Sequence, residues 1–453
     1  MRWRAIRVEA RKLLALGVPV AITQLGAMTL GVVDTIMVGH VGVLELDAAA
    51  LGNLWLLGTM ILGIGTIFGM DPLVSQAHGS GDRRTVALTL QRGILIALAC
   101  SIPIGASWLL TGTALRSFGQ EAALADAAHE YVVLQIPSLA FFFVFNAIRQ
   151  WLQGRGIVGP ALWVVLLANV FNVVANWVLI FGHLGMPALG LEGAAIATAS
   201  TRVFQCVALV IWVRALRLHQ GGWIPWSREA LDPRGLSVVL RLGIPIGIQY
   251  GLEVWAFQAA TLLAGRLGEI PLAAHVIALN LASLTFMVPL GMSIGTATRV
   301  GNLVGAGKRR DAQRAAYVGL GMGAAVMTLA AAAFITLRDL LPAAFTDDVE
   351  TRMLAASILP IAAAFQLFDG TQAVGAGVLR GMGATRPAAL INLVGFYVLA
   401  LPIAWWLGFH QALGVRGVWW GLCLGLASVA AALVLYVRVR GPAHAVAVGV
   451  FDR

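Results

Sequence analysis

Long apolar runs separated by short polar segments occupy most of this chain. Each run is close to the roughly 20 residues that one helix needs to cross a bilayer, and a helix satisfies its own backbone hydrogen bonds in lipid. We therefore predict twelve membrane-spanning helices. The predicted spans cover residues 13–37, 48–70, 91–112, 130–150, 160–182, 190–213, 237–262, 272–296, 315–337, 352–378, 387–408 and 413–437.

The basic residues between the apolar runs predict the topology. If both termini are cytoplasmic, five of the 31 Lys and Arg residues fall in loops on the opposite side, and Arg202 falls inside a span. All the others lie in cytoplasmic loops and tails, which is the excess that such loops carry in membrane proteins. We therefore expect a multi-pass protein with both termini in the cytoplasm.

The two sets of six spans are predicted to be repeats, because glycines recur at a constant separation. Gly17 and Gly65, for example, have partners 226 positions later at Gly243 and Gly291. Six spans per half would start both halves on the same side of the membrane, as in parallel repeats. The predicted domains are an N-terminal six-helix lobe at 1–214, a cytoplasmic linker at 215–236 and a C-terminal six-helix lobe at 237–453.

The composition excludes several classes of protein. Charged residues make up 11% of the chain, against about 25% in soluble proteins. The net charge of +10 could suggest nucleic acid, but the basic residues lie between apolar runs rather than along one face. We therefore expect membrane lipid, and not nucleic acid, as a partner. No nucleophile, metal-ligand or cofactor motif is visible, so neither an enzyme nor a cofactor is expected.

Acidic residues inside the predicted spans are the functional candidates, because a charge at mid-bilayer costs roughly 2.5–3.5 kcal/mol. Glu253 is central in the seventh span, with Gln249 one turn earlier on the same face. Asp369 lies in the tenth span, flanked by Gln366 and Gln372 on one narrow stripe. Two carboxylates on different helices could share a proton or bind Na⁺ through their oxygens.

Asp34, late in the first span, is the candidate in the N-terminal half. Its repeat partner is Ala260, so the repeat itself does not require an acid there. Asp34 could bind a proton or a cation, or it could stabilise helix packing by hydrogen bonds. Asn172 and Asn176 lie one turn apart on one face of the fifth span, which structural hydrogen bonding between helices would explain equally well.

Four stretches of the chain resemble the multidrug and toxic compound extrusion (MATE) family, especially its NorM-like bacterial branch. They are residues 33–37, 273–275 with 278–280, 289–301 and 377–381. The resemblance covers nearly the whole chain. It implies the MATE fold, with a V-shaped pair of six-helix lobes, and export of organic cation drugs by Na⁺ or H⁺ antiport in a bacterial inner membrane.

The resemblance also implies roles for individual residues. Asp34 matches the acid of the N-terminal lobe, and its matching polar neighbours are Asn172, Asn176 and Thr198. Glu253 and Asp369 match the cation-binding acids of the C-terminal lobe. The DinF-like branch carries an acid near the position of Asn176, so we do not expect a mechanism with two N-lobe acids here.

We therefore predict a monomeric multidrug exporter that works by alternating access. Phe257 and Phe365 are predicted to stack on lipophilic cations in an anionic cavity. Na⁺ is slightly favoured over H⁺, because Glu253 and Asp369 with neighbouring amides offer more oxygen ligands than one proton needs. Three alternatives remain: a lipid-linked oligosaccharide flippase, a channel and a membrane enzyme. The flippase would need basic residues to bind a pyrophosphate.

Overall fold

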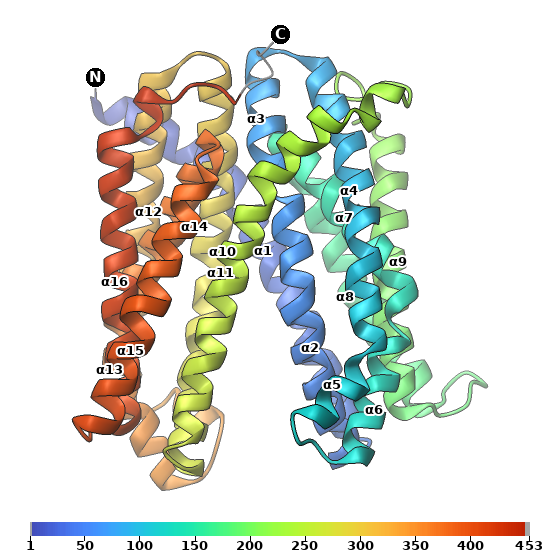
Figure 1. Ribbon diagram of the computed structural model, residues 1–453, viewed down its shortest axis with the longest axis vertical. Coiled ribbons are helices and arrows are strands. Elements are labelled where there is room, and N and C mark those ends of the chain that lie inside the picture. Colours follow the sequence, from blue (N-terminus) through green and yellow to red (C-terminus); the bar gives the residue numbers. More distant parts are fainter. Residues whose placement is uncertain (1, 449–453) are drawn as a thin grey trace. The chain divides into compact units, whose positions relative to one another are not determined.

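The computed structural model describes residues 2–448, and the regular secondary structure of this part is entirely helical (Figure 1). The predicted all-α membrane fold is therefore confirmed. The α-helices of the first half are α1 (Arg2–Gly39), α2 (Val43–Ile67), α3 (Met70–Ser80), α4 (Arg83–Leu109), α5 (Thr111–Ser117), α6 (Ala122–Val133), α7 (Ile136–Gly154), α8 (Gly159–Phe181) and α9 (Gly190–Ala215).

The second half repeats this sequence of long helices. Its α-helices are α10 (Pro233–Gly265), α11 (Glu269–Gly305), α12 (Arg309–Thr336), α13 (Val349–Met382), α14 (Thr385–Leu393), α15 (Leu401–Trp405) and α16 (Gly414–Arg440). Two π-helical segments, η3 (Val394–Ala400) and η4 (Trp406–His410), flank α15 and continue the same span. Short 3₁₀ turns are η1 (Arg228–Leu231), η2 (Pro342–Ala344) and η5 (Pro442–His444).

Eleven helices of the described chain are long and apolar enough to cross a membrane, and α6 with α7 can form a twelfth span. The axes of α6 and α7 differ by 51°. Pro137 lies in the first turn of α7 and has no N–H to donate to the carbonyl of Val133, where α6 ends, so one continuous helix is interrupted there. The predicted run at 130–150 therefore folds as a bent pair.

Two acidic side chains mark where long helices begin. Asp82 accepts a hydrogen bond from the Thr85 amide at 3.0 Å at the start of α4, and Asp348 accepts one from the Thr351 amide at 2.8 Å at the start of α13. Each bond satisfies a backbone donor that the first turn leaves without a partner. The hydrogen bonds from Thr351 also hold the pKa of Asp348 below its ordinary value, so this cap weakens as pH falls through that pKa.

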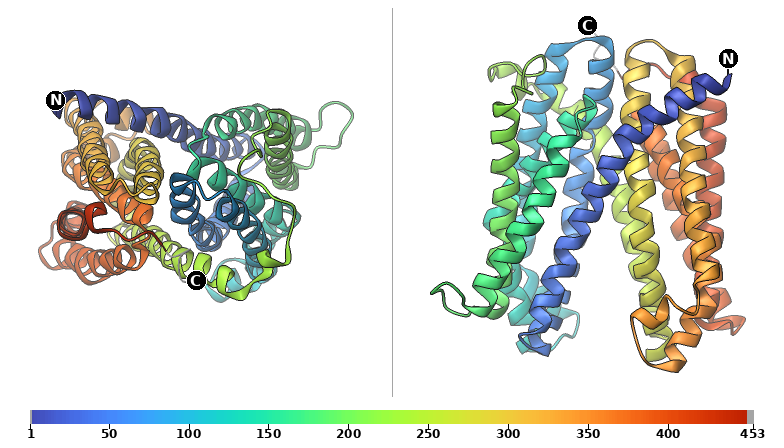
Figure 2. Two further views of the ribbon diagram at one scale, coloured as in Figure 1. Left: turned by 90° about the horizontal axis from the view of Figure 1, so that it is seen from above. Right: turned by 180° about the vertical axis from the view of Figure 1, so that it is seen from behind.

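The contacts divide the chain into two compact units. Unit 1 contains residues up to Ile22, residues 75–81 and residues from Ile248 onward; unit 2 contains residues 23–74 and 82–247. The helix α1, unbroken from Arg2 to Gly39 (dark blue in Figure 2), thus contributes to both units, and so does α10. Each compact unit therefore contains segments from both predicted lobes. The predicted boundaries at 214 and 237 delimit the sequence repeat, and they remain a prediction.

The repeated glycines lie where these helices approach one another closely. A Cβ atom at Gly243 of α10 would lie 2.0 Å from the carbonyl oxygen of Thr66 in unit 2. In unit 1, a Cβ atom at Gly17 of α1 would lie 3.2 Å from the Cα atom of Met292. Gly243 lies 226 residues after Gly17, and Met292 lies 226 residues after Thr66. Equivalent positions of the repeat therefore form the same kind of helix crossing in each unit. The glycine repeat is thus a packing requirement.

The predicted topology can be tested by cysteine accessibility. We expect single cysteines at Glu121 and Asp347 to react with an impermeant thiol reagent from outside the cell, and cysteines at Lys308 and Arg228 to remain unlabelled. All four positions are exposed, so a difference in labelling reports the side of the membrane. The background should lack the native cysteines, of which Cys100 is partly exposed. Equal labelling of the two sets in intact cells would contradict twelve spans with cytoplasmic termini.

Candidate functional site

The two acids of unit 1 come together inside its helix bundle. Glu253 lies on α10 and is 8% exposed, and Asp369 lies on α13 and is 4% exposed. The Gln372 amide nitrogen donates a hydrogen bond to Glu253 Oε2 at 3.3 Å. Glu253 and Asp369 also interact electrostatically. The structure therefore brings together the two carboxyl groups that the sequence placed on different spans.

The two acids form no ion pair with a basic side chain among the described residues. A buried carboxylate without a counter-charge is strongly destabilised, so such a group takes up either a proton or a cation. The arrangement is therefore suited to reversible uptake of a positive charge.

The oxygen of the neighbouring amide is also without a donor. Gln372 Oε1 is buried and accepts no hydrogen bond from the described residues, while its Nε2 atom donates to both Glu253 and Asn392. A buried acceptor without a partner costs free energy, and a bound cation would remove this cost. Carboxylate and amide oxygens are ligands of the kind that hard cations take, and Na⁺ binding at this pair stays a prediction.

The remaining glutamines predicted around the pair form no hydrogen bond to either acid in the described structure. Gln366 is buried on α13 and donates to Thr285 Oγ1 at 2.6 Å. Gln249 is buried on α10, and the described structure contains no hydrogen bond from it to either acid. Asn392 of α14, by contrast, was missed by the sequence analysis although it is fully buried and bonded to Gln372 at 3.2 Å. A lone Asn within an apolar run was the available signal.

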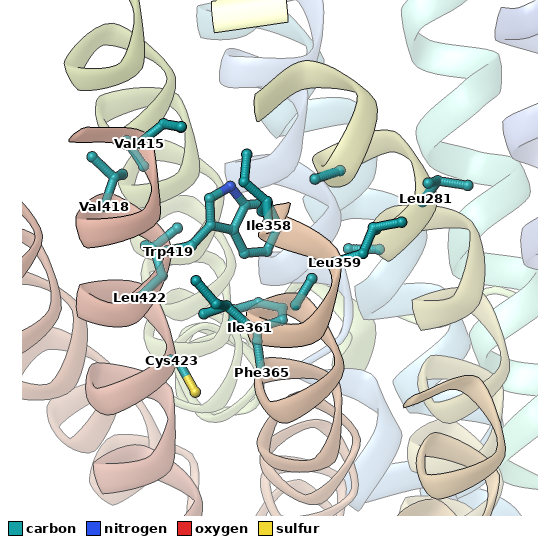
Figure 3. Packing of buried hydrophobic residues seen from close by; sticks show 14 of the residues in the cluster. Leu281, Ile358, Leu359, Ile361, Phe365, Val415, Val418, Trp419, Leu422 and Cys423 are labelled. Atoms are coloured by element: carbon teal, nitrogen blue, oxygen red, sulfur yellow. The ribbon is translucent and has the colours of Figure 1, made fainter. Parts of the chain in front are cut away.

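The predicted aromatic residues lie in the core of unit 1. The rings of Phe257 and Phe365 meet edge to face at 6.0 Å, and Phe365 packs in the same way against Trp419 at 5.6 Å. Phe365 is only 1% exposed, and Figure 3 shows it among the apolar side chains between α13 and α16. A drug could stack on Phe365 only if this cluster opened. The assignment of both rings to a substrate cavity remains a prediction.

Asp34 of unit 2 is held by the polar residues that the sequence analysis named. Asn176 Nδ2 donates to Asp34 Oδ1 at 2.6 Å, and Thr198 Oγ1 donates to Asp34 Oδ2 at 2.8 Å. Asn172 accepts from Asn176 Nδ2 at 3.2 Å and donates to Thr201 at 3.4 Å. Three helices, α1, α8 and α9, therefore meet in one buried hydrogen-bond network at this carboxyl group.

A basic residue near Asp34 distinguishes this site from that of unit 1. Arg202 lies one turn after Thr198 on α9, and its charge interacts with Asp34 and with the buried Tyr131. The Arg202 guanidinium lies 5.5 Å from the Phe142 ring centre and donates to Ser138 Oγ at 3.4 Å. The sequence analysis noted Arg202 inside a span but gave it no role, although an intramembrane charge is itself a functional signal.

We expect Asp34→Asn to lower drug efflux strongly while leaving the protein in the membrane. The asparagine keeps the shape of the side chain but removes the charge that Asn176, Thr198 and Arg202 surround. Efflux of a fluorescent organic cation from cells measures the effect. The control is Asp47→Asn, an acid near the start of α2 in the same unit, which should transport normally. Full efflux by the Asp34 variant would show that this carboxyl group serves only helix packing.

Comparison with known proteins identifies relatives over most of the chain. The family model MatE matches twice, at residues 19–178 and 245–406, one match in each predicted repeat. The Multidrug and toxin extrusion protein 1 of Xenopus tropicalis is 33% identical over 415 residues, which is 91% of this chain and 71% of that protein. The mouse protein of the same name is 34% identical over 421 residues, 92% of this chain and 72% of that protein.

A solved structure resembles this chain in fold. The eukaryotic MATE transporter AtDTX14 aligns with a TM-score of 0.90 and 24% identity, over 97% of each chain. This likeness confirms the predicted MATE fold. The two named relatives are vertebrate proteins, so they do not confirm the NorM-like branch or a bacterial membrane. Both expectations remain predictions.

Proposed function

Since the chain belongs to the MATE family of multidrug and toxin extrusion transporters, we propose that it exports lipophilic organic cations in exchange for Na⁺ or H⁺. The exchange would follow alternating access, with the site open to one side of the membrane at a time. The names of the relatives support extrusion of drugs and toxins. The coupling ion and the class of substrate belong to the proposal.

The observation that carries this proposal is the buried pair Glu253 and Asp369 with no basic partner among the described residues. An organic cation and the coupling ion would compete for the oxygens of the same two carboxylates. Binding of an organic cation and binding of the coupling ion would therefore oppose each other at these carboxylates. This negative coupling between two ligands is what makes transport an exchange.

We retain Na⁺ as slightly favoured over H⁺. A proton needs one carboxylate, whereas Na⁺ needs several oxygen ligands. The Gln372 Oε1 atom, which accepts no hydrogen bond from the described residues, supports the choice of Na⁺. The positive charge of Arg202 already stabilises the Asp34 carboxylate, so an added cation would stabilise it less. The pair in unit 1 is thus the proposed coupling site. A bacterial inner-membrane location, cytoplasmic termini and a monomeric working unit belong to the same proposal.

The test is drug exchange in proteoliposomes under imposed gradients. At constant pH, an inward Na⁺ gradient is expected to drive export of a fluorescent organic cation, and a pH gradient without Na⁺ is expected to drive it less. Collapse of each gradient with a selective ionophore is the control. Transport that ignores Na⁺ and follows only the pH gradient would assign the exchange to H⁺. Transport that ignores both gradients would contradict antiport.

The alternative to an exporter of organic cations is a lipid-linked oligosaccharide flippase. A flippase would have to hold a pyrophosphate, which requires basic residues. The proposed coupling site contains two acids instead, so the residues support an exporter of cations. Translocation of a pyrophosphate-linked lipid by the same proteoliposomes, without exchange of organic cations, would favour the flippase.

A further inference from the structure

An apolar groove runs along one side of unit 1. It has a volume of about 500 Å³ and lies between α12, α13 and α16. Ala324 of α12 and Leu367 and Phe368 of α13 line it, together with the face of α16 from Ala427 to Arg438. This volume falls within the range of about 300–1,000 Å³ typical of small-molecule sites.

Short side chains explain why the groove exists. The helices α12 and α16 both pack against α13 (Figure 1). Where they face each other, Ala324, Ala427 and Ala431 are too short to fill the space between them. At one end, Gln313 Nε2 of α12 donates to the Val437 carbonyl of α16 at 3.0 Å and ties the two helices together. The groove is therefore built into the packing of the unit.

The dimensions of the groove match one leaflet of a bilayer. The eleven-residue step from Ala427 to Arg438 corresponds to about 16 Å at 1.5 Å per residue, close to half of a hydrocarbon core about 30 Å thick. Leu435 in its wall is 61% exposed, so the groove is open along its side. An open, apolar groove of this length along membrane-spanning helices fits one acyl chain.

The charge at the end of the groove selects the headgroup. Arg438 is exposed in the last turn of α16, and it forms no hydrogen bond or ion pair with the residues that the structure describes. A guanidinium binds phosphate oxygens with two parallel hydrogen bonds. Basic residues at the cytoplasmic ends of spans attract anionic lipids in the same way.

We propose that this groove is a binding site for an anionic glycerophospholipid. One acyl chain lies along α16 from Leu435 to Ala427, and the phosphate lies on the Arg438 guanidinium. The alanines make room for the chain, and Arg438 provides the preference for an anionic over a zwitterionic lipid.

The test compares lipid binding to the purified full-length protein by native mass spectrometry. The probes are phosphatidylglycerol and phosphatidylcholine with the same acyl chains. Arg438→Gln is expected to weaken phosphatidylglycerol binding about fivefold, as one basic charge at a membrane surface does, and Arg438→Lys should retain most of the preference. The matched control is Arg440→Gln, a second exposed arginine of the same turn that does not line the groove.

A second pair of variants tests the acyl-chain part of the site. Ala431→Trp fills the groove and is expected to weaken binding of both lipids, whereas Leu424→Trp, on an exposed part of α16 outside the groove, should not. Equal weakening by the Arg438→Gln and Arg440→Gln variants would mean that only general surface charge attracts lipid, and would overturn the proposal. Unchanged binding in the Ala431→Trp variant would overturn it as well.

Discussion

Glu253→Gln and Asp369→Asn are each expected to lower cation-coupled drug exchange by roughly 10–150-fold, because a contact to a charged group contributes about 1.5–3 kcal/mol. Each change keeps the size of the side chain and removes one of two buried charges in unit 1. If the pair is the coupling site, the one remaining carboxylate would bind the coupling ion and the drug too weakly to exchange them. Initial rates of exchange in proteoliposomes, at matched protein content, measure the effect.

The control for these variants is Glu269→Gln, because Glu269 is an exposed acid in the first turn of α11 in the same unit. It should exchange drug at the wild-type rate. A second check is the direct binding of drug without a gradient, which the Glu253 and Asp369 variants should also weaken. Normal exchange by both variants would rule out this pair as the coupling site. It would not affect the assignment of the chain to the MATE family, which rests on sequence similarity.

Gly243→Ala is expected to be the most destabilising small substitution in unit 2. The added Cβ atom would lie 2.0 Å from the Thr66 carbonyl oxygen, which is backbone and cannot move aside as a side chain would. Overpacking of this kind costs about 1–3 kcal/mol, or more where backbone is involved. The thermal midpoint of the detergent-solubilised protein should therefore fall, and the yield of monodisperse protein with it.

Gly31→Ala is the matched control, since Gly31 is also a helical glycine of unit 2 but has no atom within 4 Å of its added Cβ. Alanine is favoured over glycine within a helix by up to about 1 kcal/mol, so this variant should be as stable as the wild type or more so. If both variants have the wild-type midpoint, the repeated glycines do not act through close helix packing.

Much of the fold followed from local pattern. Apolar runs of sufficient length can satisfy their backbone only as helices in lipid, so the spans were predictable from the sequence. The repeat was visible because a close crossing tolerates only glycine, and the same crossing occurs at Gly17 and Gly243. The acids stood out for a related reason: a charge within an apolar run is costly, so Asp34, Glu253 and Asp369 were recognisable from their place in the chain.

The sequence by itself thus determined the helices, the repeat and the candidate acids, whereas the tertiary structure decided which residues meet. Hydrogen bonds between distant helices leave no fixed spacing in a sequence, so the contact of Asn392 with Gln372 and the binding of Gln366 to Thr285 could not be predicted. Division of α1 and α10 between two compact units depends on long-range packing. The charge of Arg202 near Asp34 likewise follows from folding, because electrostatic interaction depends on distance in space rather than along the chain.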